Sequence, residues 1–222
     1  MNVTKDIDRY INELELDLSG LKIFTEAATG LYRLNPVAAK IAGADEVYAY
    51  DKHNSIGNTV FLEMNSVGVL WDKYTDAVSQ ADIITNSGYV RPIDKMFIVL
   101  MKPTAVISLM FEPWEFKHRP QDIDLYEASK KKILVMGTNE RKVPVEFYLK
   151  LTVLFLLFMT SHKIIPLPFS FNSQRWILAL FLAGLKVGEL MARCRLAGLG
   201  IRETMEECLK NELVLGLDEW RI

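Results

Sequence analysis

Five short, continuously apolar runs that alternate with helical segments constrain the fold of this chain more than any other feature. The runs are residues 21–25, 46–50, 81–85, 104–111 and 133–136. A strand that is covered on both faces is apolar throughout, whereas a half-exposed strand is apolar at every second position. The runs therefore predict a sheet with helices on both of its faces. Strictly alternating strands and helices predict parallel strands joined by right-handed crossovers.

Helices are predicted between these strands, and several begin at a proline. The predicted ranges are 36–42, 58–74, 92–100, 121–132 and 144–161, and a further amphipathic helix is predicted at 4–16 with Thr4 as its N-cap. Pro36, Pro92, Pro120 and Pro144 stand at or next to the predicted starts. Proline is tolerated in the first helical turn, where its missing N–H would have no partner in any case. Asn35 is a suitable N-cap for the first of these helices.

The remaining sequence predicts a helical extension of an α/β domain. Helices are predicted at 173–191 and 201–213, and no element is predicted at 214–222. The expected fold is α/β, with a parallel Rossmann-like three-layer sheet and a helical C-terminal extension. Residues 1–142 form the α/β domain with its N-terminal helix. Residues 143–222 form the extension, which we expect to act as a dimerisation arm.

The net charge and the cysteine content limit the kinds of partner and the cellular compartment that we expect for this protein. The formal charge is −2, from 26 basic and 28 acidic residues, whereas a nucleic-acid-binding protein usually carries a basic excess. Cys194 and Cys208 both fall in predicted helices and do not make a disulfide framework. The N-terminal sequence has no signal-peptide pattern, and the apolar run 151–159 is too short to span a membrane. We expect a cytoplasmic protein without a nucleic-acid or membrane partner.

Polar residues follow the predicted strands and indicate a ligand site at one edge of the sheet. In open parallel α/β sheets, ligands bind beyond the carboxyl ends of the strands. Asp51 follows Gly30 by 21 positions, which suits a carboxylate that binds ribose hydroxyls, although a turn-forming aspartate is an equal alternative. The candidate cofactor-binding residues are Thr29, Gly30, Asp51, Asn86, Ser87 and Gly88.

The same segments supply candidates for substrate binding and catalysis. Arg91, next to a predicted helix start, could pair with an anion, and Trp114 could stack on a flat ligand. Asn139 is the third candidate for substrate binding, and the candidate acids are Glu26, Glu112 and Glu115. Ordinary surface and loop roles remain the alternatives for these residues. The three histidines lie far apart in the sequence, so we expect no metal.

The second half of the chain resembles the two-domain NAD(P)-dependent D-2-hydroxyacid dehydrogenases. The resemblance rests on DIDLYEASKKKILV at 122–135, GTNE at 137–140, the apolar helix at 144–161 and the strand–turn–helix pattern of 163–187. It implies a Rossmann-like fold, NAD or NADP as cofactor, and an oxidoreductase acting on a small polar metabolite. The chain departs from the family at 166–173, where PLPFSFNS replaces the glycine fingerprint. None of the catalytic Arg, Glu and His residues of that family can be carried over onto positions of this sequence.

Three functions follow from these observations. The first is a nucleotide-cofactor-binding, dehydrogenase-related protein with a small-molecule ligand. The second is an S-adenosylmethionine-dependent methyltransferase, in which Asp51 would bind the ribose. The third is a non-catalytic homodimeric interaction protein that uses its apolar helices as an interface. Whether the chain is an enzyme stays open at this point.

Overall fold

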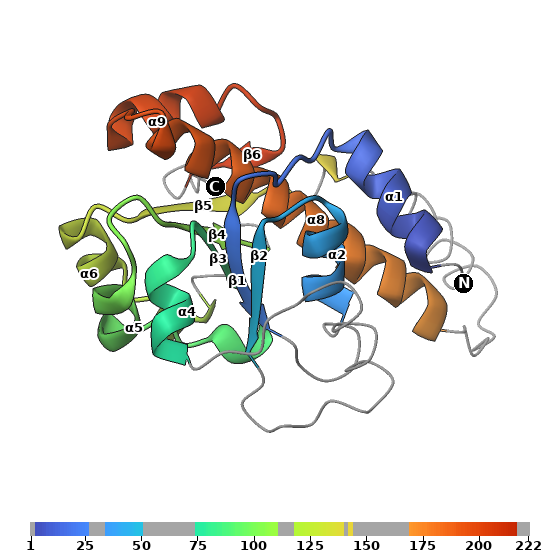
Figure 1. Ribbon diagram of the computed structural model, residues 1–222, viewed down its shortest axis with the longest axis horizontal. Helices are drawn as coiled ribbons and strands as arrows, with labels where there is room; N and C mark the ends of the chain where they lie inside the picture. Colours follow the sequence, from blue (N-terminus) through green and yellow to red (C-terminus); the bar gives the residue numbers. More distant parts are fainter. Residues whose placement is uncertain are drawn as a thin grey trace, which may run out of the picture.

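The computed structural model describes residues 3–26, 34–50, 74–110, 118–139, 142–143 and 169–216. A six-stranded sheet with the order β2-β1-β3-β4-β5-β6 forms its centre (Figure 1). The strands are β1 Lys22–Glu26, β2 Glu46–Tyr50, β3 Ile83–Asn86, β4 Val106–Leu109, β5 Leu134–Thr138 and β6 Val214–Leu215. The first five pair in parallel, and β6 pairs antiparallel to β5. The prediction of a parallel α/β sheet is confirmed.

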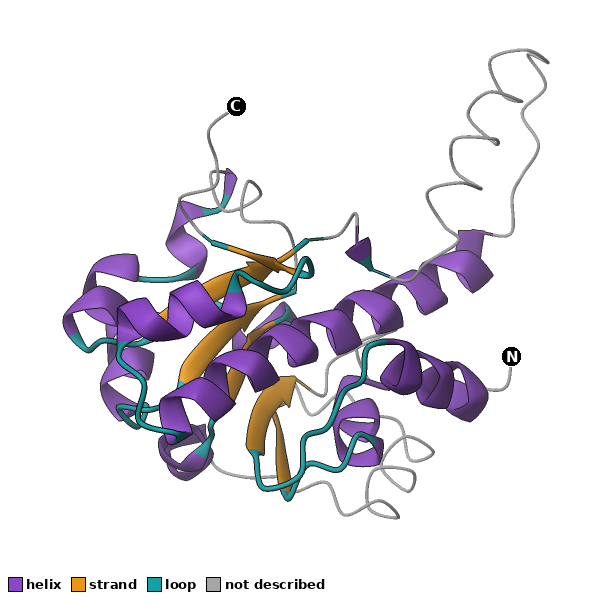
Figure 2. Ribbon diagram, turned by 90° about the horizontal axis from the view of Figure 1, so that it is seen from above, coloured by secondary structure: helices purple, strands orange, loops and turns teal. Residues whose placement is uncertain are grey.

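Helices cover both faces of this sheet (Figures 1 and 2). The α-helices are α1 Val3–Glu13, α2 Asn35–Ile41, α4 Tyr74–Gln80, α5 Lys95–Leu100, α6 Leu125–Lys130, α8 Phe169–Leu196 and α9 Ile201–Cys208, and the 3-10 helices are η2 Gly88–Val90 and η4 Pro120–Asp122. Side chains alternate between the faces of a strand, so neighbouring residues enter different cores. Ile23 and Ile83 pack with α1, α2, α8 and α9, whereas Phe24 and Ile84 pack with α4, α5 and α6.

Several helices begin later than their prolines suggest. Lys95 begins α5 and Leu125 begins α6. The capping residues are Asp94 and Asp124, whose carboxylates accept hydrogen bonds from the backbone N–H groups of Phe97 at 2.9 Å and Glu127 at 3.0 Å. An aspartate at the N-cap satisfies one of the N–H groups that a helix start leaves without a partner. These aspartates, and not Pro92 and Pro120, therefore fix the two starts. Pro144 lies outside the described residues.

The predicted N-cap role of Asn35 is wrong. Asn35 is the first residue of α2, Leu34 precedes it as the N-cap, and no side chain caps this helix start. Pro36 lies in the first turn, as predicted. The helix predicted at 58–74 lies outside the described residues except for its last position, where α4 begins.

The long helix α8 lies on the sheet. Its buried hydrophobic side chains are Leu178, Ala179, Leu180, Phe181, Leu182, Ala183, Leu185, Val187, Met191 and Ala192. They share one core with β1, β3, β4 and β5, so the chain itself covers these apolar side chains of α8. The domain boundary at 142 stays a prediction, because residues 144–168 are not described. The sequence missed β6, whose two residues are too few for a recognisable pattern.

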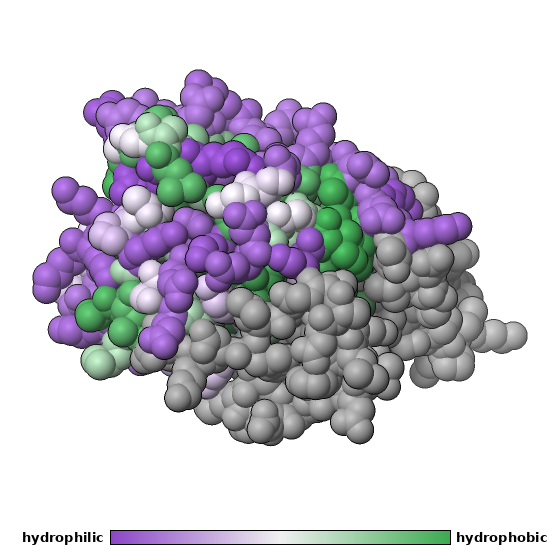
Figure 3. Space-filling model, viewed as in Figure 1, coloured by the Kyte–Doolittle hydropathy of each residue, from purple (hydrophilic) through white to green (hydrophobic). Residues whose placement is uncertain are grey.

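Polar residues predominate on the face of the described chain that is shown in Figure 3. Among the described residues, the large hydrophobic side chains that are exposed are Met96, Val99, Tyr126, Leu196 and Leu209. Single exposed apolar residues of this kind are normal on a protein surface. Within the described ranges, none of the helices has the length and the apolar character needed to cross a membrane.

Cys208 connects α9 to the core, and its thiol has an unusual pKa. Burial, followed by the neighbouring Cys194, raises the pKa of Cys208 from 9.0 to about 12. Between these two values the unfolded chain loses the thiol proton while the folded chain retains it. The free energy of unfolding should therefore fall as the pH rises through this range.

We expect Cys208→Ala to reduce this loss of stability. Urea unfolding of the wild type and the variant should be compared below pH 9 and between pH 9 and about 12. The wild type should lose more of its unfolding free energy over that interval than the variant does. An equal loss in both proteins would show that Cys208 does not titrate abnormally.

Candidate functional site

The order of the strands changes direction between β1 and β3. The chain passes from β1 through α2 to β2 at one edge, and then returns through α4 to β3 on the other side of β1. The helices α2 and α4 pack on opposite faces of the sheet. In doubly wound sheets with the strand order 2-1-3-4-5, this β1/β3 switch point is where ligands bind, at the carboxyl ends of the two strands.

Buried polar residues gather at these carboxyl ends. They are Thr25 and Glu26 of β1, Thr85 and Asn86 of β3, and Ser87, and each is at most 2% exposed. We call them the switch-point cluster. The Thr85 hydroxyl donates to the Thr25 hydroxyl at 2.9 Å, and the Thr85 and Ser87 hydroxyls are 3.0 Å apart. Two adjacent strands thus end in a hydrogen-bonded series of hydroxyl groups instead of apolar side chains.

Gly88 makes room for the carboxylate of Glu26. The φ angle of Gly88 is +37°, a conformation that favours glycine, and a Cβ atom there would lie 1.5 Å from Oε2 of Glu26. The Glu26 carboxylate therefore lies against the backbone where η2 begins. The sequence predicts Gly88 as a cofactor contact, whereas in the structure the space that its missing side chain leaves is taken by Glu26.

Asn86 is the unusual member of the switch-point cluster. Its side chain is 1% exposed, and neither its amide nitrogen nor its amide oxygen has a hydrogen-bond partner among the described residues. A buried amide without partners costs about 1–3 kcal/mol of stability. Asn35 at the start of α2 is fully buried and shares this property. A native chain that keeps two such amides calls for an explanation, and a ligand that binds them is one.

Arg91 is engaged by the protein itself. Its guanidinium donates to Oδ2 of Asp122 at 3.0 Å, and Arg119 lies 3.5 Å from the same oxygen. Backbone hydrogen bonds between Ile93 and the segment 122–124 bring the two loops together. The predicted role of Arg91 in binding an anionic ligand stays a prediction, and in the structure its guanidinium pairs with an internal carboxylate.

Asn139 lies apart from the switch point, at the end of β5. Its side-chain amide donates to the backbone oxygen of Glu212 at 3.0 Å, and its backbone N–H donates to Leu213 at 2.8 Å. Lys142 pairs with the Glu212 carboxylate at 2.5 Å. These contacts fix the return of the chain into β6. Because β4 lies between β3 and β5, Asn139 does not join the switch-point cluster.

The remaining predicted site residues lie outside the described residues. They are Thr29, Gly30, Asp51, Glu112, Trp114 and Glu115. The sequence-based candidates Glu26, Asn86 and Ser87 lie in the switch-point cluster, and their roles stay predictions, whereas Thr25, Thr85 and Asn35 were not among the site candidates. The two threonines carry a recognisable signal, since each stands near the end of an apolar run and is followed by a polar residue, in FTE and ITN.

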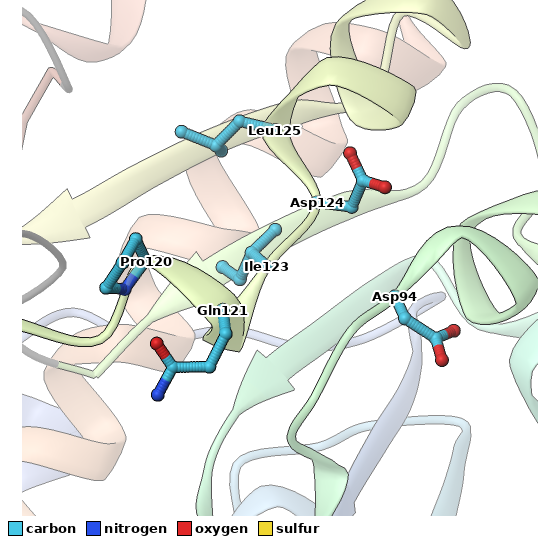
Figure 4. A pocket seen from close by; sticks show the side chains of 6 residues that line it. All are labelled: Asp94, Pro120, Gln121, Ile123, Asp124 and Leu125. Carbon is cyan, nitrogen blue, oxygen red and sulfur yellow. The ribbon is translucent and has the colours of Figure 1, made fainter.

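A cavity of about 410 Å³ lies beside the starts of α5 and α6 (Figure 4). Its lining residues are Asp94, Pro120, Gln121, Ile123, Asp124 and Leu125. Figure 4 shows Asp94 and Asp124 coming from the two helix starts. Both carboxylates already cap their own helices, so helix formation explains them. In the described part of the chain, no group of three or more His, Cys, Asp or Glu side chains could hold a metal ion.

Comparison with known proteins gives matches only among solved structures. No family model and no curated protein matches the chain. It is similar to shikimate 5-dehydrogenase from Listeria monocytogenes in complex with shikimate and NAD, with 15% identity and a TM-score of 0.40 over 60% of this chain and 50% of that one.

Two further dehydrogenases are similar over more of this chain. D-lactate dehydrogenase from Aquifex aeolicus, complexed with NAD and lactic acid, is 13% identical with a TM-score of 0.39 over 94% of this chain and 64% of that one. Formate dehydrogenase from Granulicella is 10% identical with a TM-score of 0.37 over 90% and 48%. The chain thus spans 48% to 64% of the length of these three enzymes. All three of these structures are named as dehydrogenases, and a likeness at this level does not extend to substrate or reaction.

Proposed function

We propose that this chain is a dehydrogenase-related protein that binds a nucleotide cofactor, NAD or NADP, or the small polar metabolite on which such a protein acts, at the β1/β3 switch point. The observation that carries the proposal is Asn86, a fully buried amide at the carboxyl end of β3 whose donor and acceptor have no described partner. Its position is the one at which sheets of this strand order bind ligands.

The chemistry of the switch-point cluster limits the group that it would bind. Asn86 offers one donor group and one acceptor group side by side, which matches a carboxamide or another group presenting both. Thr25, Thr85 and Ser87 already bond to one another and orient their hydroxyls before any ligand arrives. The Glu26 carboxyl group offers oxygen acceptors, so it favours the hydroxyl groups of a ligand over phosphate, which itself presents oxygen acceptors. The cluster therefore suits the uncharged, hydroxylated part of a ligand.

We expect Glu26→Gln to weaken ligand binding about tenfold, because the amide replaces an acceptor oxygen with a donor, and a buried polar group that loses its partner costs about 1–3 kcal/mol. Thermal-shift screening and calorimetric titration would use NAD, NADP, S-adenosylmethionine and S-adenosylhomocysteine as probes. Preferential binding of the last two would favour the methyltransferase alternative. No binding of any probe at millimolar concentration would overturn the proposed cofactor role.

Asp82→Asn is the matched control for Glu26→Gln. Asp82 is also a buried acid, but it precedes β3 and therefore lies at the amino ends of the strands, away from the switch-point cluster. There it accepts from the Lys22 N–H at 2.9 Å and pairs with Lys102 at 2.5 Å. The Asp82→Asn variant should be less stable than the wild type but should bind the ligand with the same dissociation constant. Equal loss of affinity in both variants would indicate a general weakening of the fold.

A cytoplasmic homodimer remains part of the proposal. The apolar face of α8 is already covered by the sheet, so a dimer would need another surface. Gel filtration with light scattering measures the mass directly. A monomer at micromolar concentration would remove the dimeric interaction protein from the candidate functions.

A further inference from the structure

The only two cysteines of the chain lie on different helices and meet in space. Cys194 belongs to the last turns of α8 and Cys208 ends α9. Both are free, and both line one cavity of about 290 Å³ together with Leu190, Glu207, Lys210 and Asn211. Cys208 is part of the core to which Cys194 packs. The sequence assigns no role to this pair, and the proposed ligand site does not use it.

The two thiols differ in exposure and surroundings. Cys194 is partly exposed, whereas Cys208 is 2% exposed. Lys210 lies beside the pair, and its ammonium group pairs with the carboxylate of Glu207 at 2.5 Å. An accessible thiol beside a cation, with a second thiol in reach, is the arrangement found in redox-sensitive pairs.

We propose that Cys194 and Cys208 are a peroxide-sensitive dithiol that closes to a disulfide between α8 and α9. This proposal is independent of the ligand site at the switch point. The oxidant is a hydroperoxide. Cys194 reacts first because it is the accessible member, and Cys208 reacts second.

Both steps balance with the hydroperoxide as the only oxidant. The Cys194 thiolate attacks one peroxide oxygen, the O–O bond breaks, and the product alcohol or water leaves with a proton, so that Cys194 becomes a sulfenic acid. The sulfur of Cys208 then attacks the sulfur of Cys194. The S–O bond breaks, hydroxide leaves as water with the proton of Cys208, and the S–S bond forms. Two thiols lose two electrons and the peroxide gains them.

The disulfide would fix α9 to α8 and thereby restrain β6. The strand β6 follows α9 after a short turn and pairs with β5 through Gly137 and Thr138. Two residues of pairing hold it weakly by themselves. With Cys208 linked covalently to α8, only the residues after Cys208 can detach from the sheet together with β6. Oxidation should therefore slow amide exchange at Asn139, whose N–H donates to Leu213.

The test uses the full chain, reduced and freed of reductant, and then treated with one equivalent of hydrogen peroxide. The oxidised protein should lose two hydrogens in mass, lose both alkylatable thiols, and give a peptide that links Cys194 to Cys208 after digestion. A dithiol reductant should restore both thiols. Two free thiols after treatment, or a disulfide between two chains only, would overturn the proposal. This measurement needs no variant, so a folding defect does not affect it.

The variants assign the order of the two steps. Cys208→Ala should leave Cys194 as a sulfenic acid that dimedone traps, and Cys194→Ala should make the protein react with peroxide at least tenfold more slowly. If Cys208 of the Cys194→Ala variant reacts as fast as the wild type, Cys194 is not the first site of attack and the proposed dithiol is wrong. Hydrogen exchange at residues 137–139 and 213–215 supplies the structural readout.

Discussion

Replacement of Asn86 by leucine is expected to raise the free energy of unfolding by about 1–3 kcal/mol and to abolish ligand binding. The same amide lowers the stability of the free protein and contributes to ligand binding, so its removal should raise stability and abolish binding. In the free protein, Asn86 is buried without a described partner, so an apolar side chain of similar size removes a desolvation cost. In the ligand complex, the amide supplies a donor and an acceptor that leucine lacks. A stability gained at the expense of function is the usual mark of a binding residue.

Thr138→Val is the matched control for this variant. Thr138 is a buried polar residue at the end of β5, and its hydroxyl donates to the backbone oxygen of Leu109 at 2.8 Å. Because this polar group has a partner, its removal should cost about 1 kcal/mol and leave binding unchanged. Urea unfolding measures the free energies, and thermal shifts with the binding probe measure the affinity. An Asn86→Leu protein that is less stable than the wild type, or that binds normally, would contradict the role of Asn86.

Gly188→Ala should destabilise the protein by about 1–3 kcal/mol, even though alanine favours a helix over glycine by about 1 kcal/mol. Gly188 lies where α8 crosses the sheet. A Cβ atom there would lie 2.6 Å from Cγ2 of Ile83 and 3.3 Å from Cβ of Ser108. Both neighbours are fully buried strand residues, so neither can move away without disturbing the core.

Gly184, one turn earlier on the same helix, is the control. A Cβ atom at Gly184 would come no closer than 3.4 Å to Met110, which is an ordinary contact. Gly184→Ala should therefore be neutral or slightly stabilising. The comparison separates helix propensity, which both variants change alike, from the close approach of α8 to β3. Equal unfolding free energies for the two variants would show that α8 does not approach β3 as closely as described.

The strands were predictable because each is an apolar run with polar residues on both sides. Burial on both faces of the sheet demands apolar residues throughout, and the observed strands agree with the predicted ranges to within two residues at each boundary. Helix starts were less predictable. Proline and aspartate are both common at helix starts, so the sequence alone does not choose between them. The capping hydrogen bonds of Asp94 and Asp124, which only the structure shows, place the starts of α5 and α6 directly after these aspartates.

The candidate site was predictable only in part. The rule that ligands bind at the carboxyl ends of parallel strands selected Glu26, Asn86 and Ser87, because it needs only the order of strands along the chain. It treated every loop alike, so it also selected Arg91 and Asn139. Their side chains bond to Asp122 and to the backbone of Glu212, which are separated from them by 31 and 73 positions. No local pattern reveals partners that distant.

The sequence by itself determined the class of fold, because hydrophobic periodicity and the alternation of strands with helices depend on neighbouring residues alone. It also determined that polar residues end the central strands. Only the tertiary structure decided which strands are adjacent, and hence that Thr25 meets Thr85 while Asn86 is buried without a described partner. It likewise decided that α8 covers one face of the sheet and that Cys194 lies beside Cys208. These outcomes depend on contacts between residues far apart in the chain, which the fold creates and which no stretch of sequence encodes alone.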